Sequence, residues 1–387
     1  MKVGLFGFGV VGRGIFDIIE TKKTSGLKRI EIKKALVSSI KGRNLDILTI
    51  NPQDIIQDKE IDTVVEVMGG INPAYDYIIS SLKAGKNVVT ANKAVVAKHF
   101  KEFVELAKEY EVKFYYEPSV CGGVPIIEGL KKVKKIDEVS EIGGIFNGTT
   151  NFILDKMTKF SAEFKETLEE AQEKGYAEAD PSADIDGIDI LRKIMISTSI
   201  AFDFLVPEKE VNVFGIRNIL KIDIDYFKEK DKVVKLMAVG KKKEDKYICC
   251  VEPVAYNFDE MEATVPTNFN IAFLKGDSIG ELKFFGQGAG KYPTGNAGVQ
   301  DLIDILEKKE YDYPEFKNKL VKDPSLVEGK YYIRTRKKIN ETRMKFIDKQ
   351  ETVKDYNVYT TKNITNEKMC NILKEIHDEN AFFVRIN

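Results

Sequence analysis

The chain opens on Met1-Lys2-Val3-Gly4-Leu5-Phe6-Gly7-Phe8-Gly9-Val10-Val11-Gly12, an apolar run that ends in glycines spaced G-x-G-x-x-G. The glycine motif closes a predicted strand at residues 3–8 and opens a predicted helix at residues 12–21. A turn of this kind allows the close backbone approach, and offers the helix N-terminus, that a dinucleotide pyrophosphate requires. The stretch therefore predicts a dinucleotide-binding site, with an ordinary glycine-rich turn as the structural alternative.

Apolar runs and amphipathic segments alternate through residues 1–130. This rhythm is typical of an α/β protein with a parallel, doubly wound sheet, so we expect a Rossmann-type NAD(P)-binding domain there. The predicted strands are residues 3–8, 31–38, 63–68, 87–90 and 112–116, and the further predicted helices are residues 73–84 and 98–110.

The pattern changes after residue 130 and predicts an α+β domain over residues 131–308. Its predicted strands are residues 139–146, 247–254 and 282–285, and its predicted helices are residues 150–174, as one or two helices, and 186–202. A charged stretch with Pro314 and Pro324 indicates a linker at residues 309–328. Residues 329–387 then predict a small unit in which three strands (331–336, 356–361 and 382–386) alternate with two helices (341–348 and 366–377).

The composition excludes several classes of function. The 387 residues include 60 Lys and Arg against 61 Asp and Glu, a net charge of -1 that disfavours nucleic acid and anionic membranes as partners. Four Cys without a C-x-x-C pair disfavour disulfides and Cys-ligated zinc and favour a reducing cytoplasm. Every apolar run is too short to cross a bilayer. With two His in the chain, catalysis at neutral pH is expected to rely on Lys, Asp, Glu or Tyr.

The loop after the second predicted strand bears on cofactor choice. NAD-selective folds usually place an acid there, but this chain has Ser38, Ser39, Lys41 and Arg43. Hydroxyls and cations suit a 2'-phosphate, so we expect NADP(H) to be preferred and NAD(H) to remain possible. A solvated loop is the alternative.

Two further segments follow strands of the first domain. Thr90-Ala91-Asn92-Lys93 places Lys93 at the carboxyl edge of the sheet, where such folds bind ligands, although most lysines only solubilise a surface. The segment at residues 117–125 is rich in Gly and Pro. Its carbonyls could face a cation or the nicotinamide, or the segment could be a hinge.

The second domain carries the candidate substrate groups. Asn147-Gly148-Thr149 starts a predicted helix and could bind a carboxylate through its N–H groups, or be a simple cap. Residues 176–189 are rich in acids. Asp189 and Lys193 stand four apart on one helix face, where a partly buried Lys beside a carboxylate is a candidate proton donor and a surface ion pair is the alternative.

Six ordered motifs in residues 1–308 resemble homoserine dehydrogenases: GFGVVG, TANK, EPSVCGGVPII, GIFNGTTNFIL, GYAEADPSADIDGIDILRK and GQGAGKYPTGNAGVQDLIDI. The resemblance implies reversible, NAD(P)-dependent hydride transfer between L-aspartate 4-semialdehyde and L-homoserine, in threonine, methionine and isoleucine biosynthesis. It also implies a return of residues 286–308 to the cofactor domain, with a helix at residues 296–306, and a homodimer or homotetramer.

The resemblance assigns roles by matching positions. It makes Lys93 and Lys193 catalytic, with Asp189 orienting Lys193. It implies a substrate pocket with Glu178 and Asp184 on the amino group and Tyr176, Gly148 and Thr149 in its lining. It implies cofactor contacts from Gly7, Phe8, Gly9, Val10, Val11, Gly12, Ser38, Lys41, Arg43, Thr90, Asn92, Lys93, Gly288, Gly290 and Thr294. It implies a structural monovalent cation, Na+ or K+, held by Glu117, Val120, Gly122 and Val124, mostly through carbonyls.

Residues 329–387 resemble an ACT-type module with a strand missing, and Lys337-Lys338-Ile339-Asn340-Glu341 replaces its usual opening turn. We therefore expect a folded regulatory or oligomerisation unit, with oligomerisation favoured over amino-acid binding. Two alternatives to the whole interpretation remain: another amino-acid or semialdehyde dehydrogenase of this fold, or a non-catalytic NADP sensor. A sensor would not need Lys93, Lys193 and Asp189 together.

Overall fold

The computed structural model describes residues 1–42 and 45–387 and divides the chain into two compact units. Unit 1 comprises Met1–Lys135 and Gly286–Phe316, and unit 2 comprises Ile136–Phe285 and Lys317–Asn387. Arg43, which the sequence places at a 2'-phosphate, lies outside the described residues. Within the described ranges, helices are all too short or too polar to cross a membrane.

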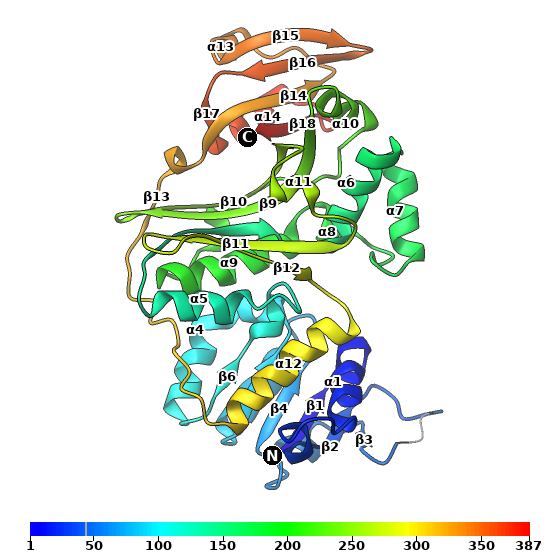
Figure 1. Ribbon diagram of the computed structural model, residues 1–387, viewed down its shortest axis with the longest axis vertical. Coiled ribbons are helices and arrows are strands. Elements are labelled where there is room, and N and C mark those ends of the chain that lie inside the picture. The colour runs from blue at the N-terminus through cyan, green and yellow to red at the C-terminus, as the bar shows by residue number, and fades with distance from the viewer. Residues whose placement is uncertain (43–44) are drawn as a thin grey trace. The chain divides into compact units, whose positions relative to one another are not determined.

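Unit 1 is built on a parallel six-stranded sheet in the order β3-β2-β1-β4-β5-β6 (Figure 1). The strands are β1 (Lys2–Phe6), β2 (Glu31–Leu36), β3 (Leu48–Thr49), β4 (Thr63–Glu66), β5 (Asn87–Thr90) and β6 (Phe114–Tyr115). The helices are α1 (Val10–Glu20), α2 (Gln53–Ile56), α3 (Ala74–Lys83), α4 (Lys93–Glu109), α5 (Ile126–Lys134) and α12 (Lys291–Leu306). The parallel pairing confirms the doubly wound sheet expected from the sequence.

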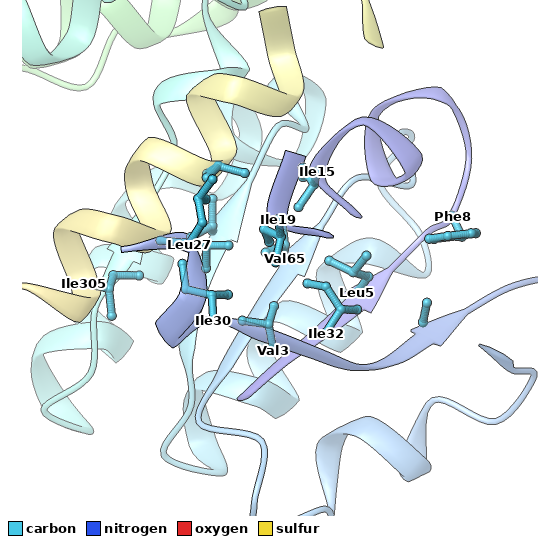
Figure 2. Packing of buried hydrophobic residues seen from close by; sticks show 14 of the residues in the cluster. Val3, Leu5, Phe8, Ile15, Ile19, Leu27, Ile30, Ile32, Val65 and Ile305 are labelled. Atoms are coloured by element: carbon cyan, nitrogen blue, oxygen red, sulfur yellow. The ribbon is translucent and has the colours of Figure 1, made fainter. Parts of the chain in front are cut away.

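The core of unit 1 forms where α1 and α12 cover one face of this sheet. Ile15 and Ile19 of α1, four residues apart, pack with strand residues such as Val3 and Leu5, as Figure 2 shows. Ile305 of α12 belongs to the same cluster. A Cβ at Gly14 would lie 2.1 Å from the Lys291 carbonyl oxygen, so glycine allows α12 to approach α1 closely.

Two helices of unit 1 begin earlier than the sequence predicts. The helix expected from residue 98 begins at Lys93, because the Asn92 side chain accepts a hydrogen bond from Val95 N and caps it. The helix implied at residues 296–306 begins at Lys291. Both changes bring a motif residue into the first turn of a helix.

The first half of unit 2 forms a mixed sheet with helices packed on it. Its helices are α6 (Gly148–Phe160), α7 (Phe164–Glu173), α8 (Ser182–Ile185), α9 (Ile188–Phe202), α10 (Lys221–Lys228) and α11 (Met261–Thr264). Its strands are β7 (Val139–Ile145), β8 (Asn212–Val213), β9 (Lys232–Lys243), β10 (Lys246–Asn257), β11 (Phe269–Gly276) and β12 (Gly280–Gln287), in the main order β12-β11-β7-β9-β10. β9 and β10 form a long antiparallel pair. The sequence did not predict β9 or β11.

The C-terminal part of the chain extends this sheet instead of forming a separate unit. It contains β13 (Val321–Lys322), β14 (Glu328–Thr335), α13 (Glu341–Met344), β15 (Ile347–Val353), β16 (Tyr356–Thr361), β17 (Ile364–Thr365), α14 (Asn366–Ile376) and β18 (Phe382–Ile386). The sheet continues from β10 in the order β18-β14-β16-β15. This is the ferredoxin-like β-α-β-β-α-β succession.

Two expectations for this region are therefore wrong. The strand expected to be missing is β15, and the helix expected at residues 341–348 is the single turn α13 followed by that strand. The expected linker also does more than connect. The ring centroids of Tyr311 and Tyr115 are 3.9 Å apart. Buried aromatic rings contribute a large apolar area to a core, so this part of the expected linker also packs in unit 1.

Candidate functional site

The glycine turn of unit 1 leaves room at the start of α1. A Cβ at Gly12 would lie 2.3 Å from the Gly7 carbonyl oxygen, and Gly7 has φ +106°, so the turn itself requires both glycines. A Cβ at Gly9, in contrast, would meet nothing within 4 Å among the described residues. Gly9 precedes α1, and within the described chain no side chain caps that helix. Open space beside uncapped N–H groups fits a pyrophosphate.

The other residues of the fingerprint differ in burial. Phe8 is buried, and the Arg13 guanidinium lies over its ring at 5.9 Å. Val10 is exposed and Val11 is partly exposed. In the loop after β2, Ser38 and Lys41 are exposed, and the Ser39 hydroxyl accepts a hydrogen bond from Lys41 N at 3.2 Å.

The carboxyl edge of the sheet contains a buried network that centres on Glu66. Thr90 donates to Glu66 Oε2 at 2.7 Å, and Asn92 Nδ2 lies 3.4 Å from Glu66 Oε1. Asn92 also donates to the Gly70 carbonyl at 2.6 Å. Burial raises the pKa of Glu66 above its ordinary value. The network fixes the residues just before Lys93, which is half-buried at the first position of α4.

Sequence reasoning missed Glu66. The available signal was an acid inside the otherwise apolar run Val64-Val65-Glu66-Val67-Met68 at the end of a predicted strand. A buried acid in such a place requires hydrogen-bond partners, and Thr90 and Asn92 of the TANK motif provide them.

Apart from Gly123, which is exposed, the segment at residues 117–124 is buried, and it is tightly turned. Cys121 and Gly122 have φ +56° and +50°, and a Cβ at Gly122 would lie 2.6 Å from the Gly288 carbonyl oxygen. The Glu117 carboxylate accepts hydrogen bonds from Ile127 N and Glu128 N and so caps α5. Burial raises the pKa of Glu117 to about 7. Val120 and Val124 are fully buried.

The segment that returns to unit 1 packs on this turn. Gly290, with φ +124°, precedes α12, and Thr294 N donates to its carbonyl at 3.2 Å. A Cβ at Gly123 would lie 2.9 Å from Pro293 Cβ. Asp301 of α12 accepts a hydrogen bond from Glu117 N at 3.1 Å. The structure thus brings Gly288, Gly290 and Thr294 together with the 117–124 segment inside unit 1.

In unit 2, Asn147 connects the start of α6 to two acids. Its Oδ1 accepts from Thr150 N at 2.8 Å and caps α6. Its Nδ2 donates to Asp184 Oδ1 at 2.7 Å and to Asp189 Oδ2 at 2.9 Å. The cap and the acid-rich segment are therefore one site, which neither motif reveals alone.

Lys193 and Asp189 form a buried ion pair on α9. Their Nζ and Oδ2 atoms are 2.8 Å apart, and the side chains are only 9% and 8% exposed. Lys193 Nζ also donates to the Phe146 carbonyl at 2.6 Å. The pair is thus not the solvated surface pair that its spacing alone allows.

Tyr176 and Glu178 lie on the more open side of this site. The Thr149 hydroxyl donates to the Tyr176 carbonyl at 2.6 Å, and the Tyr176 ring packs edge-on against Phe152. Both Tyr176 and Glu178 are exposed. A hydrogen bond to the Tyr176 carbonyl and a ring contact therefore join the start of α6 to the segment that carries Glu178.

Comparisons with known proteins agree over both units. Residues 7–117 match the family model described as homoserine dehydrogenase, NAD binding domain, and residues 125–303 match that of homoserine dehydrogenase. Homoserine dehydrogenase of Bacillus subtilis (strain 168) is 32% identical over 99% of this chain and 90% of its own length. That of Synechocystis sp. is 40% identical over 79% and 73%.

Solved structures give the same result. A homoserine dehydrogenase from Thiobacillus denitrificans has a TM-score of 0.88 at 30% identity and covers 100% of this chain and 98% of its own. A hyperthermophilic archaeal homoserine dehydrogenase in complex with NADPH has a TM-score of 0.69 at 26% identity, over 80% and 98%. Neither another dehydrogenase of this fold nor an NADP sensor is favoured. The chain belongs to the homoserine dehydrogenase family and is a nicotinamide-dependent oxidoreductase that interconverts L-aspartate 4-semialdehyde and L-homoserine.

Proposed function

We propose that Lys193 is the acid/base group of this reaction and that Asp189 orients it. The buried pair at 2.8 Å carries the proposal, because it holds an ammonium at a defined position in a water-poor site. When bound, the nicotinamide supplies or accepts the hydride. During reduction Lys193 donates a proton to the carbonyl oxygen of the semialdehyde, and during oxidation its neutral amine removes the proton from the homoserine hydroxyl.

The amino acid itself is held by groups around the start of α6. The N–H groups of Gly148 and Thr149 lie in the first turn of that helix and receive the substrate carboxylate. Glu178 and Asp184 pair with the substrate ammonium, with Tyr176 beside them. Support comes from Asn147, which ties Asp184 and Asp189 to the α6 cap. Lys93 is proposed as the second catalytic lysine, supported by its place directly after the Glu66 network.

NADP(H) is proposed as the preferred cofactor, with NAD(H) also accepted. The open space at Gly9 and the uncapped start of α1 fit the pyrophosphate. Exposed Ser38 and Lys41 suit the 2'-phosphate, and a relative of this fold binds NADPH. Thr90, Asn92, Gly288, Gly290 and Thr294 complete the proposed contacts.

A structural monovalent cation is proposed at Glu117, Val120, Gly122 and Val124. Two consecutive left-handed residues in a buried turn give the main chain the sharp curvature that lets carbonyl oxygens converge. The carboxylate of Glu117 already accepts two N–H groups, so main-chain oxygens would provide most ligands. Thermal unfolding in NaCl, KCl and tetramethylammonium chloride at equal ionic strength tests this, because only the small cations should raise the melting temperature.

We further propose a homodimer or homotetramer in a reducing cytoplasm. Phe285 on the edge strand β12 is exposed, and so is Ile279, the residue directly before that strand. A second copy of the chain could cover these apolar side chains at the edge of the sheet. None of the four cysteines, all of which lie among the described residues, forms a disulfide. Light scattering on the wild-type chain and on Phe285→Lys tests the assembly.

The catalytic assignment is tested by the kinetics of Lys193→Ala in both directions, with NADPH affinity measured separately by fluorescence. A kcat within about threefold of wild type would remove Lys193 from the mechanism. Loss of kcat with intact NADPH affinity supports it.

A further inference from the structure

Unit 2 contains a second buried lysine, Lys235 on β9, which the proposed mechanism does not use. The residue is 0% exposed, and its Nζ donates to the Val265 carbonyl at 2.7 Å and to Asn151 Oδ1 at 2.9 Å. Both partners are neutral, and burial lowers the pKa of Lys235 to about 8. A buried ammonium with neutral partners disfavours folding, so apolar packing does not explain why a lysine stands here.

Asn151 connects Lys235 to a loop. It lies on the first turn of α6, two residues after Thr149. Its Nδ2 lies 2.9 Å from the Thr267 carbonyl oxygen and between 3.2 and 3.4 Å from the carbonyls of residues 265, 266 and 269. One amide shares its two hydrogens among these carbonyls. Asn151 therefore ties the 265–269 loop to the start of α6, and Lys235 orients Asn151.

The same loop contacts α6 at two other points. Thr267 N donates to Asp155 Oδ2 at 3.0 Å, one helical turn beyond Asn151. Thr267 has φ +46°, a conformation that is costly for a β-branched residue unless its surroundings hold it. A Cβ at Gly148 would lie 2.6 Å from the Asn268 carbonyl oxygen. The loop backbone thus packs directly on the first residue of the helix, and its position sets that of Gly148.

We propose that Lys235 is a positioning residue for substrate recognition. Through Asn151 it holds the 265–269 loop against Gly148, and so it fixes the N–H groups of α6 that receive the carboxylate of the amino-acid substrate. This rests on the carboxylate site proposed above. Neither Lys235 nor Asn151 touches substrate, so their effect falls on the binding of the amino acid and not on hydride transfer.

The primary test is Asn151→Asp, which leaves Lys235 an acceptor but offers no N–H to the loop carbonyls. We expect the KM for homoserine to rise about tenfold, the effect of roughly one lost hydrogen bond, with kcat within about threefold and the KM for NADP+ unchanged. Hydrogen–deuterium exchange at residues 265–269 should become faster. Lys235→Met should change the homoserine KM in the same direction. Lys165→Ala, in an exposed i,i+4 pair on α7, is the control and should change none of these values.

3-Aminopropan-1-ol, which is homoserine without its carboxylate, distinguishes this inference from the proposed function. Its inhibition constant should be unchanged in Asn151→Asp, because it lacks the group that α6 receives. An unchanged homoserine KM despite faster loop exchange would overturn the inference, as would equal weakening of homoserine, the amino alcohol and NADP+. If the wild-type enzyme binds the amino alcohol as tightly as homoserine, the carboxylate site itself is wrong and the inference falls with it. If Lys235→Met does not fold, Asn151→Asp still decides.

Discussion

The ammonium of Lys193 lies 2.8 Å from the carboxylate of Asp189, one helical turn before it, and both side chains are more than nine-tenths buried. Because the pair is so little exposed, water cannot take the place of the Asp189 carboxylate as partner of the ammonium when that carboxylate is removed. Removing one partner of a buried pair leaves an uncompensated charge, which is far more costly than loss of an exposed pair. The first prediction follows from this difference.

Lys193→Ala should lower kcat by roughly 100-fold to 10,000-fold while NADPH affinity stays near wild type, because the proton donor is lost but the cofactor site is in unit 1. Asp189→Asn should have a similar effect, since an unpartnered buried lysine changes its position and its pKa. The double variant should be little worse than the worse single variant. Lys101→Ala, in an exposed i,i+4 pair on α4, is the matched control and should leave kcat alone. Steady-state kinetics measures all four.

Glu178→Gln should act mainly on the KM for homoserine. Its proposed role is to pair with the substrate ammonium in ground state and transition state alike, so its loss weakens binding without slowing the bound complex. We expect an increase of about tenfold or more in KM, with kcat within about threefold. A large fall in kcat with unchanged KM would give Glu178 a different role.

Lys41→Ala should weaken NADPH selectively. If Lys41 pairs with the 2'-phosphate, its removal raises the KM for NADPH by about tenfold and leaves that for NADH unchanged. The wild-type enzyme should use NADP(H) at least as well as NAD(H). The two values of kcat/KM provide the check, and a strong preference of the wild type for NAD(H) would show that the loop after β2 does not bind the phosphate.

The C-terminal strands should be required for the stability of unit 2. Arg334 of β14 and Asp223 of α10 form an ion pair at 2.7 Å with both side chains 0% exposed. Arg334→Leu should lower the free energy of unfolding by about 3–5 kcal/mol, because it leaves Asp223 buried and unpaired. Arg343→Ala removes an exposed pair with Glu375 and should cost at most about 1 kcal/mol. Equal effects in urea unfolding would contradict this prediction.

Lys235 should make stability depend on pH. Its pKa is about 8 in the folded chain, against an ordinary value of 10.5. Below pH 8 the folded chain also carries the proton, so burial of the ammonium costs its full free energy. Between pH 8 and pH 10.5 only the unfolded chain keeps the proton, so this cost decreases as the pH rises. Relative to Lys235→Met, the free energy of unfolding of the wild type should rise by about 1 kcal/mol per pH unit above that pKa. The charge of Asp155 raises the pKa of Lys235, and the charge of Lys159 lowers it. If the difference in free energy of unfolding between the wild type and Lys235→Met does not vary with pH, Lys235 has an ordinary pKa and the prediction is wrong.

The sequence by itself determined the features that depend on neighbouring residues. The glycine turn before α1 and the Asn147 cap of α6 are local, because each is built within a few residues of one loop. The alternation of strands and helices in residues 1–130 likewise predicted the parallel sheet. The six motifs identified the family because their order and residue types can be compared without coordinates.

Only the tertiary structure decided which polar residues meet inside the protein. Glu66 joins Thr90 across two strands, Lys235 reaches Asn151 over 84 residues of chain, and Arg334 reaches Asp223 over 111. It also decided that residues 347–353 form β15, which pairs with β16 at the edge of the sheet. Local periodicity contains no information on such pairs, because the free energy of a buried polar group depends on partners that the fold brings from distant parts of the chain.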